Sequence, residues 1–333
     1  MYLSNRTQSV KCNSTISEEL IIKTGVPQGS ILGPLLFLLY VNDLHLHLTC
    51  SDLDMYADDS TLSVTDRSVA VIQNKVQSDL LKIEKWCVAN NMILNPTKTT
   101  AILIGTPYKT KRSTPLTLTV NGFKIKSVTN QKVLGIDIDQ HLKWDIHIDS
   151  VCKKLSTKFT LLRKVSKFLN LEMKQMFYHA YLVPVFDYGS IIWCNAPKSY
   201  ISKVYSFQKS VARWILIKPL STSSNIMFKE LKWLSIENRH KMHIAIMTFK
   251  ALHGLTPTYI KQIITVSENK TYSLRSNSKC LLSHFRHNSE YMKQSFKFLS
   301  LLCWNSLPET VRNTSSLSSF KYKCKQFYQA GNK

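Results

Sequence analysis

The chain has 333 residues, 44% of them apolar and 20% charged, which is enough apolar material for a sizeable core in about two domains. Only 9 residues are glycine, and the usual glycine-rich cradles for dinucleotide or triphosphate phosphates are absent. No apolar run is long enough to cross a bilayer, and no secretory signal is found, so we expect an intracellular protein of the nucleus or cytoplasm without a membrane partner.

The charge is unevenly distributed. Lys and Arg number 44 against 21 Asp and Glu, a net charge of +23. Residues 1–149 hold 15 basic and 14 acidic side chains, net +1, whereas residues 150–333 hold 29 and 7, net +22. A basic surface of this size favours nucleic acid as the partner, with an anionic membrane surface as the alternative. The eight cysteines include no C-x-x-C pair and are expected to be free thiols.

The first residues predict the tail of a helix and then two strands, near 8–11 and 20–23, around a polar turn. A loop with three glycines follows at residues 24–34. The helix expected at 35–46 is apolar nearly all round and should therefore be buried. From the residues alone, the loop either feeds a core helix or lets a ligand approach its backbone closely.

Two short strands next flank the sequence Tyr56-Ala57-Asp58-Asp59, which is a hairpin pattern. Aspartate is common in solvated turns, and that is the first interpretation. The second is a cation site, because two adjacent carboxylates repel each other and a bound Mg²⁺ would relieve the repulsion.

The rest of the first half alternates helix and strand patterns. Apolar residues at steps of three and four predict an amphipathic helix over 69–90. We expect a strand at 100–104, a hairpin of 116–120 and 123–128 around Asn121-Gly122, and a further strand at 133–138.

Four motifs in this order together resemble the palm of reverse transcriptases from non-LTR retrotransposons, the jockey-like kind in particular. They are Gly25-Val26-Pro27-Gln28-Gly29-Ser30, Tyr56-Ala57-Asp58-Asp59, Leu94-Asn95 with Lys98-Thr99, and Leu134-Gly135 with Asp139, Leu142 and Trp144. The resemblance implies an α+β fold. A partial palm, with an antiparallel sheet plus helices, would cover residues 1–148, an all-α thumb 149–219 and a helical C-terminal region 220–333.

The resemblance also implies an activity, RNA-directed DNA synthesis by two-metal phosphoryl transfer, with an RNA template, a DNA primer and deoxynucleoside triphosphates as partners. Asp58 would bind both Mg²⁺ (or Mn²⁺) ions, with Asp59 in a supporting role, and Lys98 would approach the triphosphate. The oligomeric state cannot be inferred from the sequence.

Further roles follow from the same resemblance. Gln28 and Gly29 would line the pocket for the templating base and incoming nucleotide, and Tyr56 would lie near the primer end. Residues 134–136 would grip the primer backbone.

In this family another catalytic aspartate precedes the glycine loop, which here begins 24 residues after Met1. We therefore expect an N-terminally truncated domain whose metal site forms only if that aspartate is supplied, and a chain that is inactive alone. Asp43, Asp52 and Asp54 are not expected to substitute. The alternatives are a non-catalytic nucleic-acid-binding remnant of such an element and a fragment too incomplete to fold stably.

The second half predicts basic helices near 148–162, 173–181 (ending near Pro184), 201–215 and 227–253, a loop at 268–287, and closing helices at 291–304 and 318–328. His240 and His243 are interpreted as surface or core histidines rather than metal ligands. The basic side chains either are solvated or rest on duplex phosphates, which would position a duplex without reading its sequence. The candidates for phosphate contact are Lys153, Lys154, Lys158, Arg163, Lys164 and Lys167.

Overall fold

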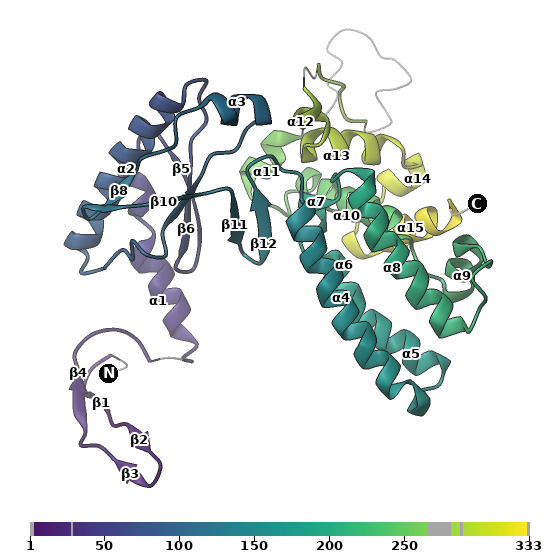
Figure 1. The fold of residues 1–333 in the computed structure, drawn as a ribbon, viewed down its shortest axis with the longest axis horizontal. Coiled ribbons are helices and arrows are strands. Elements are labelled where there is room, and N and C mark those ends of the chain that lie inside the picture. The colour runs from purple at the N-terminus through teal and green to yellow at the C-terminus, as the bar shows by residue number, and fades with distance from the viewer. Residues whose placement is uncertain (1–2, 28, 265–280, 287–288, 332–333) are drawn as a thin grey trace. The chain divides into compact units, whose positions relative to one another are not determined.

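The structure is a computed structural model that describes residues 3–27, 29–264, 281–286 and 289–331 (Figure 1). It is mixed helix and strand, which agrees with the predicted α+β class. The chain forms two compact units, Met1–Thr129 and Asn130–Lys333, called the N-terminal and C-terminal units below. In the described ranges no helix is both long and apolar enough to cross a membrane.

The N-terminal unit begins with paired strands. β1 (Arg6–Gln8) is antiparallel to β4 (Leu20–Ile22), and β2 (Lys11–Cys12) pairs with β3 (Thr15–Ile16). This matches the predicted strands to within a few residues, although residues 3–5 form turns rather than the expected end of a helix. The guanidinium of Arg6 donates to the carbonyl oxygen of Gly25 at 2.6 Å and so anchors the start of the glycine loop.

The apolar helix after this loop is not buried as predicted. α1 (Leu32–Val41) buries only Gly33 and Val41, while Leu35 and Leu38 are each 54% exposed and Leu39 is 66% exposed. A helix that is apolar all round needs cover on every side. Only the side carrying Val41 packs here, against a core shared with the next long helix. The 3₁₀ turn η1 (Leu44–His47) follows.

The predicted hairpin and amphipathic helix are both confirmed. β5 (Asp52–Tyr56) and β6 (Asp59–Ser63) pair antiparallel, beside α2 (Val69–Ala89) (Figure 1). Leu53, Met55 and Leu62 pack from the hairpin on the buried side of α2, where Ile83 and Trp86 lie. Among the described residues these two strands pair only with each other.

The remaining strands of this unit are short. β8 (Thr119–Val120) and β9 (Phe123–Lys124) form the predicted hairpin around Asn121 and Gly122, whose φ angles of 50° and 78° suit a two-residue turn. The second arm is shorter than predicted, because β10 (Lys126–Val128) pairs instead in parallel with β7 (Thr100–Ile102). The helix α3 (Pro107–Arg112) was not predicted.

The C-terminal unit opens with a hairpin where one strand was predicted. β11 (Asn130–Val133) and β12 (Ile136–Asp139) pair antiparallel. The prediction of a continuous strand at 133–138 was wrong because Leu134 and Gly135 have φ angles of 46° and 83° and reverse the chain. This hairpin belongs to the C-terminal unit, so the units divide ahead of the predicted palm–thumb boundary at residue 148.

Helices make up the rest of the unit. The helix expected to end near Pro184 continues through a π-helical turn, and the helix expected over 227–253 is broken at Lys232, which has a φ of 55°. The predicted loop at 268–287 lies largely outside the described residues. The helical elements are α4 (Asp145–Val165), η2 (Ser166–Phe168), α5 (Leu171–Phe177), η3 (Tyr178–Leu182), α6 (Val183–Asp187), α7 (Ser190–Trp193), α8 (Lys198–Leu216), α9 (Ser224–Leu231), α10 (Ile236–Leu252), α11 (Thr258–Ile263), α12 (Glu290–Lys293), α13 (Phe296–Asn305), α14 (Glu309–Arg312) and α15 (Leu317–Ala330).

Two large apolar clusters hold these helices together. The first centres on Phe186 and Trp193, neither of them exposed, and on the buried face of α4. The second joins α10, α13 and α15 through Phe249, Trp304 and Phe320. α4 and α8 lie side by side (Figure 1).

Candidate active site and nucleic-acid interface

The tip of the β5–β6 hairpin carries the adjacent carboxylates. Tyr56 lies opposite Asp59 in the ladder, so Ala57 and Asp58 form the two-residue turn. Ala57 has a φ of 54°, in the left-handed region that residues other than glycine rarely adopt. The surrounding hairpin holds this residue in a costly conformation, which is a feature often found at functional sites.

Asp58 and Asp59 are both exposed, and in the described part of the chain neither side chain forms an ion pair or a hydrogen bond. Carboxylate oxygens are the ligands that Mg²⁺ prefers, and two adjacent anions with no cationic neighbour fit a divalent ion. They are nevertheless only part of a ligand set. No group of three or more His, Cys, Asp or Glu that could hold a metal ion occurs within the described ranges.

Three nearby acidic residues, Asp43, Asp52 and Asp54, were not expected to complete the site. Asp52 and Asp54 alternate with Leu53 and Met55 along β5, so they lie on its exposed face, further down the strand. Asp43 instead accepts a hydrogen bond from the indole nitrogen of Trp86 at 3.2 Å. The expectation that none of the three replaces a missing ligand remains a prediction.

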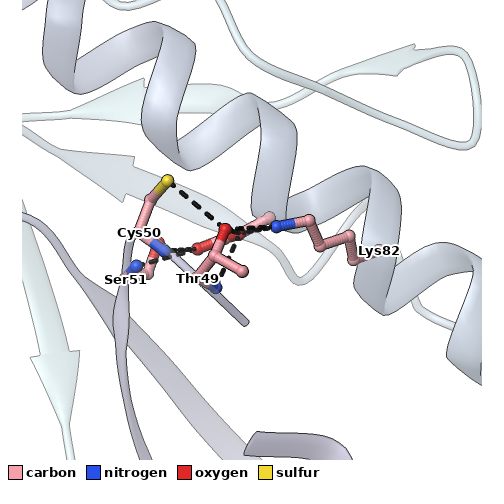
Figure 2. Close-up of polar contacts among 5 residues, drawn as sticks. Thr49, Cys50, Ser51 and Lys82 are labelled. Carbon is pink, nitrogen blue, oxygen red and sulfur yellow. Dashed lines mark hydrogen bonds and ion pairs between the residues drawn. The ribbon is translucent and has the colours of Figure 1, made fainter. Parts of the chain in front are cut away.

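A fully buried carboxylate, which the sequence reading missed, fixes the start of the hairpin (Figure 2). Asp79 on α2 accepts the backbone N–H groups of Cys50 at 2.9 Å and Ser51 at 2.8 Å, and the Lys82 ammonium at 2.8 Å. Burial alone would raise the pKa of Asp79, but these hydrogen bonds outweigh it and hold the pKa well below its usual value. An acidic residue beside the apolar stripe of an amphipathic helix was the only available signal.

The glycine loop is open where a ligand would approach its backbone. Gly25 and Gly29 both have φ angles of 77°, and a Cβ on either would meet nothing within 4 Å. Gln28, the predicted substrate residue between them, lies outside the described residues. Gly33 has a different role, since a Cβ there would come within 2.9 Å of the Ser30 hydroxyl.

Lys98 lies in an exposed loop after α2. The side chain of Asn95 accepts the backbone N–H of Thr97 at 3.0 Å and gives this loop its shape. Within the described residues, no hydrogen bond or ion pair joins Lys98 to Asp58 or Asp59. The structure therefore does not bring Lys98, the residue predicted to approach the triphosphate, into hydrogen-bonding contact with the carboxylates.

The last of the four motifs has clear structural roles in the C-terminal unit. The hydroxyl of Tyr188 donates to the carbonyl oxygen of Leu134, and a Cβ on Gly135 would lie 3.3 Å from the Tyr188 ring. The carboxylate of Asp139 accepts the backbone N–H groups of His141 at 2.9 Å and Trp144 at 2.8 Å. These contacts fix the Leu134-Gly135 turn and the entry to α4.

The predicted basic residues lie on or just after α4 and are all exposed except half-buried Lys158. Lys153 and Lys164 are about three turns apart and share one side of the helix. Lys158 lies over the Tyr181 ring at 5.5 Å, and Lys167 over the ring of Phe168 at 5.1 Å. The six residues thus form a cationic surface that spreads around α4 rather than a single narrow stripe.

Comparisons with known proteins agree with the hairpin and loop motifs. Residues 2–138 match the family described as "Reverse transcriptase (RNA-dependent DNA polymerase)". The chain is 28% identical over 250 residues to the probable RNA-directed DNA polymerase from transposon X-element of Drosophila melanogaster, covering 73% of this chain and 27% of that protein. It is 26% identical over 242 residues to the RNA-directed DNA polymerase from mobile element jockey of the same species, covering 69% and 26%.

The chain spans about a quarter of the length of the curated relatives it matches. No solved structure matches it. Polymerases of this family generally use divalent metal ions. Residues 2–138 therefore match the reverse transcriptase family, and the chain is similar to the RNA-directed DNA polymerases of non-LTR retrotransposons.

Proposed function

We propose that residues 1–148 contribute a polymerase palm and residues 149–219 its thumb, in an enzyme that copies RNA into DNA. Residues 220–333 would be a helical region attached to the thumb. In the reaction, the 3′-hydroxyl of a DNA primer attacks the α-phosphate of a deoxynucleoside triphosphate, and pyrophosphate leaves. The observation that carries this proposal is the exposed, unpaired pair Asp58–Asp59 on a strained turn, inside the segment that matches the family.

In this proposal Asp58 and Asp59 are ligands for Mg²⁺ or Mn²⁺. Bound divalent ions supply a site that activates the attacking oxygen and stabilises the leaving one. The protein holds the carboxylates at the hairpin tip, and Asp79 holds the hairpin on α2. Two carboxylates are too few to complete the coordination shells of two ions, so the described residues by themselves form an incomplete site.

The exposed residues around the tip would contact the substrates. Tyr56, which is 69% exposed at the end of β5, would lie beside the primer end. The open backbone at Gly29, with Gln28 before it, would face the templating base and the incoming nucleotide. Lys98 is exposed, and in the described structure its side chain forms no hydrogen bond or ion pair with the carboxylates. Its side chain would contact the triphosphate when that substrate binds.

The thumb would hold the template–primer duplex through its phosphates. Lys153, Arg163, Lys164 and Lys167 are exposed on α4 and η2 and project from a unit with a large positive charge. Such contacts add affinity and position the duplex without reading its sequence.

A chimera tests the proposed activity. Residues 2–138 would replace the corresponding segment of the jockey polymerase, and primer extension on RNA would be measured with Mg²⁺. We expect DNA synthesis, and Asp58→Asn should lower its rate by more than about 100-fold, since even the loss of outer partners of a metal site costs 10–100-fold. The matched control is Asp52→Asn on the same hairpin, which should change the rate little. Synthesis that is indifferent to Asp58→Asn would refute the assignment.

The alternative function, a non-catalytic nucleic-acid-binding protein, is favoured by one observation: the segregation of charge into residues 150–333. It predicts tight, salt-sensitive binding by the full chain while the chimera makes no DNA. An active chimera would exclude it.

A further inference from the structure

A cavity of about 210 Å³ lies in the C-terminal unit, and its lining includes none of the six basic residues proposed to hold nucleic acid. It opens where the end of α9, the start of α10, the π-turn η3 and the helix α15 meet. Its lining residues are Tyr178, His179, Lys232, Trp233, Leu234, Arg239, Met242 and Lys325.

The cavity carries an excess of positive charge. The guanidinium of Arg239 makes a two-point contact with the carboxylate of Asp187, with one N–O distance of 2.8 Å, which neutralises that pair. Lys232 and Lys325 are exposed at the cavity, and neither has an acidic partner among the described residues. The two lysines therefore face the cavity with their charges uncompensated.

The positions of these lysines are fixed by the fold. The side-chain amide of Gln329, one turn after Lys325 on α15, donates to the carbonyl oxygen of Lys232 at 2.8 Å. Asn238, at the start of α10, donates to the carbonyl oxygen of Tyr328 at 3.0 Å. These two hydrogen bonds connect the break after α9 and the first turn of α10 to α15. The backbone positions of Lys232 and Lys325 are therefore held close to each other.

The floor of the cavity is rigid and apolar. The rings of Tyr178 and Trp233 stack with centroids 3.5 Å apart and planes 8° from parallel, and both side chains are almost fully buried. The nearby imidazole of His179 is kept neutral, because burial lowers its pKa and the charges of Arg239 and Lys325 lower it further. An anion entering the cavity would meet the two lysine ammonium groups beside this buried aromatic pair.

We propose that this cavity is a phosphate-binding site, for the phosphate group of a free nucleotide or of a nucleic-acid backbone. Lysine is a side chain that proteins use for phosphate, and the two lysines here have no acidic partner among the described residues. The half-buried Arg239 lies beside them in its pair with Asp187. The cavity is smaller than the 300–1,000 Å³ typical of sites for drug-sized ligands, so it would take a phosphate with part of its sugar rather than a longer stretch of chain. This assignment is separate from the proposed polymerase site and does not depend on it.

Lysine-reactivity footprinting of the full chain tests the proposal. The chain is acetylated at constant ionic strength alone and with inorganic phosphate, deoxyadenosine 5′-monophosphate or a 12-nucleotide single-stranded DNA, and modification of each lysine is measured by mass spectrometry. Lys232 and Lys325 should be protected at least threefold more than the exposed Lys198 and Lys261. Protection by all three probes would identify a small phosphate site, and protection by the DNA alone would identify a backbone site. Equal protection of the four lysines, or none, would overturn the proposal.

Matched double variants separate this site from the general effect of charge. Lys232→Gln/Lys325→Gln and Lys198→Gln/Lys261→Gln remove the same net charge from exposed positions of the same unit. Binding is measured for whichever of the three probes protects Lys232 and Lys325 from acetylation. The Lys232→Gln/Lys325→Gln variant should bind that probe at least threefold more weakly than the Lys198→Gln/Lys261→Gln variant, and both should keep the circular dichroism of the unchanged protein. Equal weakening by the two pairs would also contradict the assignment, because it would reduce the effect to long-range attraction.

Discussion

The two units of this protein are packed to different degrees. All of the largest side chains that are fully buried, such as Trp193, Phe249 and Trp304, lie in the C-terminal unit of the described structure. The N-terminal unit has small cores around Trp86 and Leu80 and leaves most of α1 exposed. The charges differ as well: residues 1–129 hold 13 basic and 10 acidic side chains, net +3, and residues 130–333 hold 31 and 11, net +20.

This difference assigns separate physical tasks to the two units. The carboxylate pair and the open glycine loop lie on the less tightly packed unit, where local opening costs less free energy. The densely packed unit carries the cations that a polyanion would contact.

Catalysis by the polypeptide of residues 1–333 should be undetectable. Asp58 and Asp59 supply two carboxylates, fewer than two-metal chemistry needs. A primer-extension assay on RNA with Mg²⁺ or Mn²⁺ should show no incorporation. Incorporation that disappears in Asp58→Ala would show that the N-terminal unit completes the metal site from its own residues.

Nucleic-acid binding should come from the C-terminal unit and depend steeply on salt. If six phosphates are neutralised by the surface on α4, the slope of log K against log salt should be about −5, a loss of roughly 10³ in affinity between 50 and 200 mM salt. Fluorescence anisotropy with duplexes of different sequence measures the slope and should show little sequence preference. Replacing Lys153 and Lys164 with Gln should reduce the slope by about 2, whereas the same change at Lys109 and Lys111 of the N-terminal unit should not. A salt-independent affinity would contradict the charge argument.

The free energy of unfolding of the N-terminal unit should depend on Asp79 far more than on any exposed carboxylate. Asp79→Asn leaves the Lys82 ammonium and three backbone N–H groups without their anion and should cost about 3 kcal/mol. Asp66→Asn, which removes an exposed ion pair with Lys75 on the same helix, should cost under about 1 kcal/mol. With 5-fluorotryptophan, the ¹⁹F signal of Trp86 reports unfolding of this unit alone, since the other five tryptophans lie in the C-terminal unit. Equal effects of the two variants would show that Asp79 does not anchor the hairpin.

The role of Asp79 also shows how far sequence patterns reach. The helix α2 and the β5–β6 hairpin were predicted correctly. Apolar residues recur every 3.6 residues along a helix and every second residue along a strand, and this spacing indicates which face of the element is buried. The same patterns cannot say which partner covers that face. α1 was therefore predicted to be buried, although its leucines are exposed.

Local chemistry was harder still to predict. The reversal at Leu134-Gly135 carries a weak turn signal, because leucine rarely takes a positive φ. Asp58 and Asp59 were proposed as ligands only through the resemblance of four motifs, each made of residues close together in the sequence. The backbone N–H partners of Asp79 lie 28 to 30 residues away, and sequence spacing does not record such contacts.

Backbone amides should exchange faster in the β5–β6 hairpin of the N-terminal unit than in α4 of the C-terminal unit. β5 and β6 pair only with each other in the described structure, so each leaves one side without a ladder partner. Amides of residues 55–64 should exchange at least about 100-fold faster than those of residues 148–162, where Ile148 and Leu155 are fully buried on α4. Mass spectrometry of the exchanged, monomeric chain measures both segments. Strong protection at 55–64 would mean that another segment covers the hairpin.

The smallest effect, when counted per pH unit, is expected for an acid sensitivity of the C-terminal unit. His240 is 4% exposed and meets the face of Trp193 edge-on, with ring centroids 4.9 Å apart. Burial lowers its pKa to about 3, and the positive charges of His243 and Arg239 act in the same direction. The folded state therefore keeps this imidazole neutral, while the unfolded state takes up a proton below pH 6.5. His240 should then contribute its full share to the free energy of unfolding above pH 6.5. That contribution should fall by about 1.4 kcal/mol per pH unit as the pH decreases toward 3.

Urea titrations at pH 6.5, 5.5 and 4.5, followed by the ¹⁹F signal of Trp193, measure this dependence of the free energy of unfolding on pH. His240→Gln should reduce its slope by the equivalent of about one proton, while His284→Gln at an exposed site should leave the slope unchanged. A slope that is the same in both variants would mean that the buried histidine does not link protonation to the stability of this unit, and that acid acts on it through other groups.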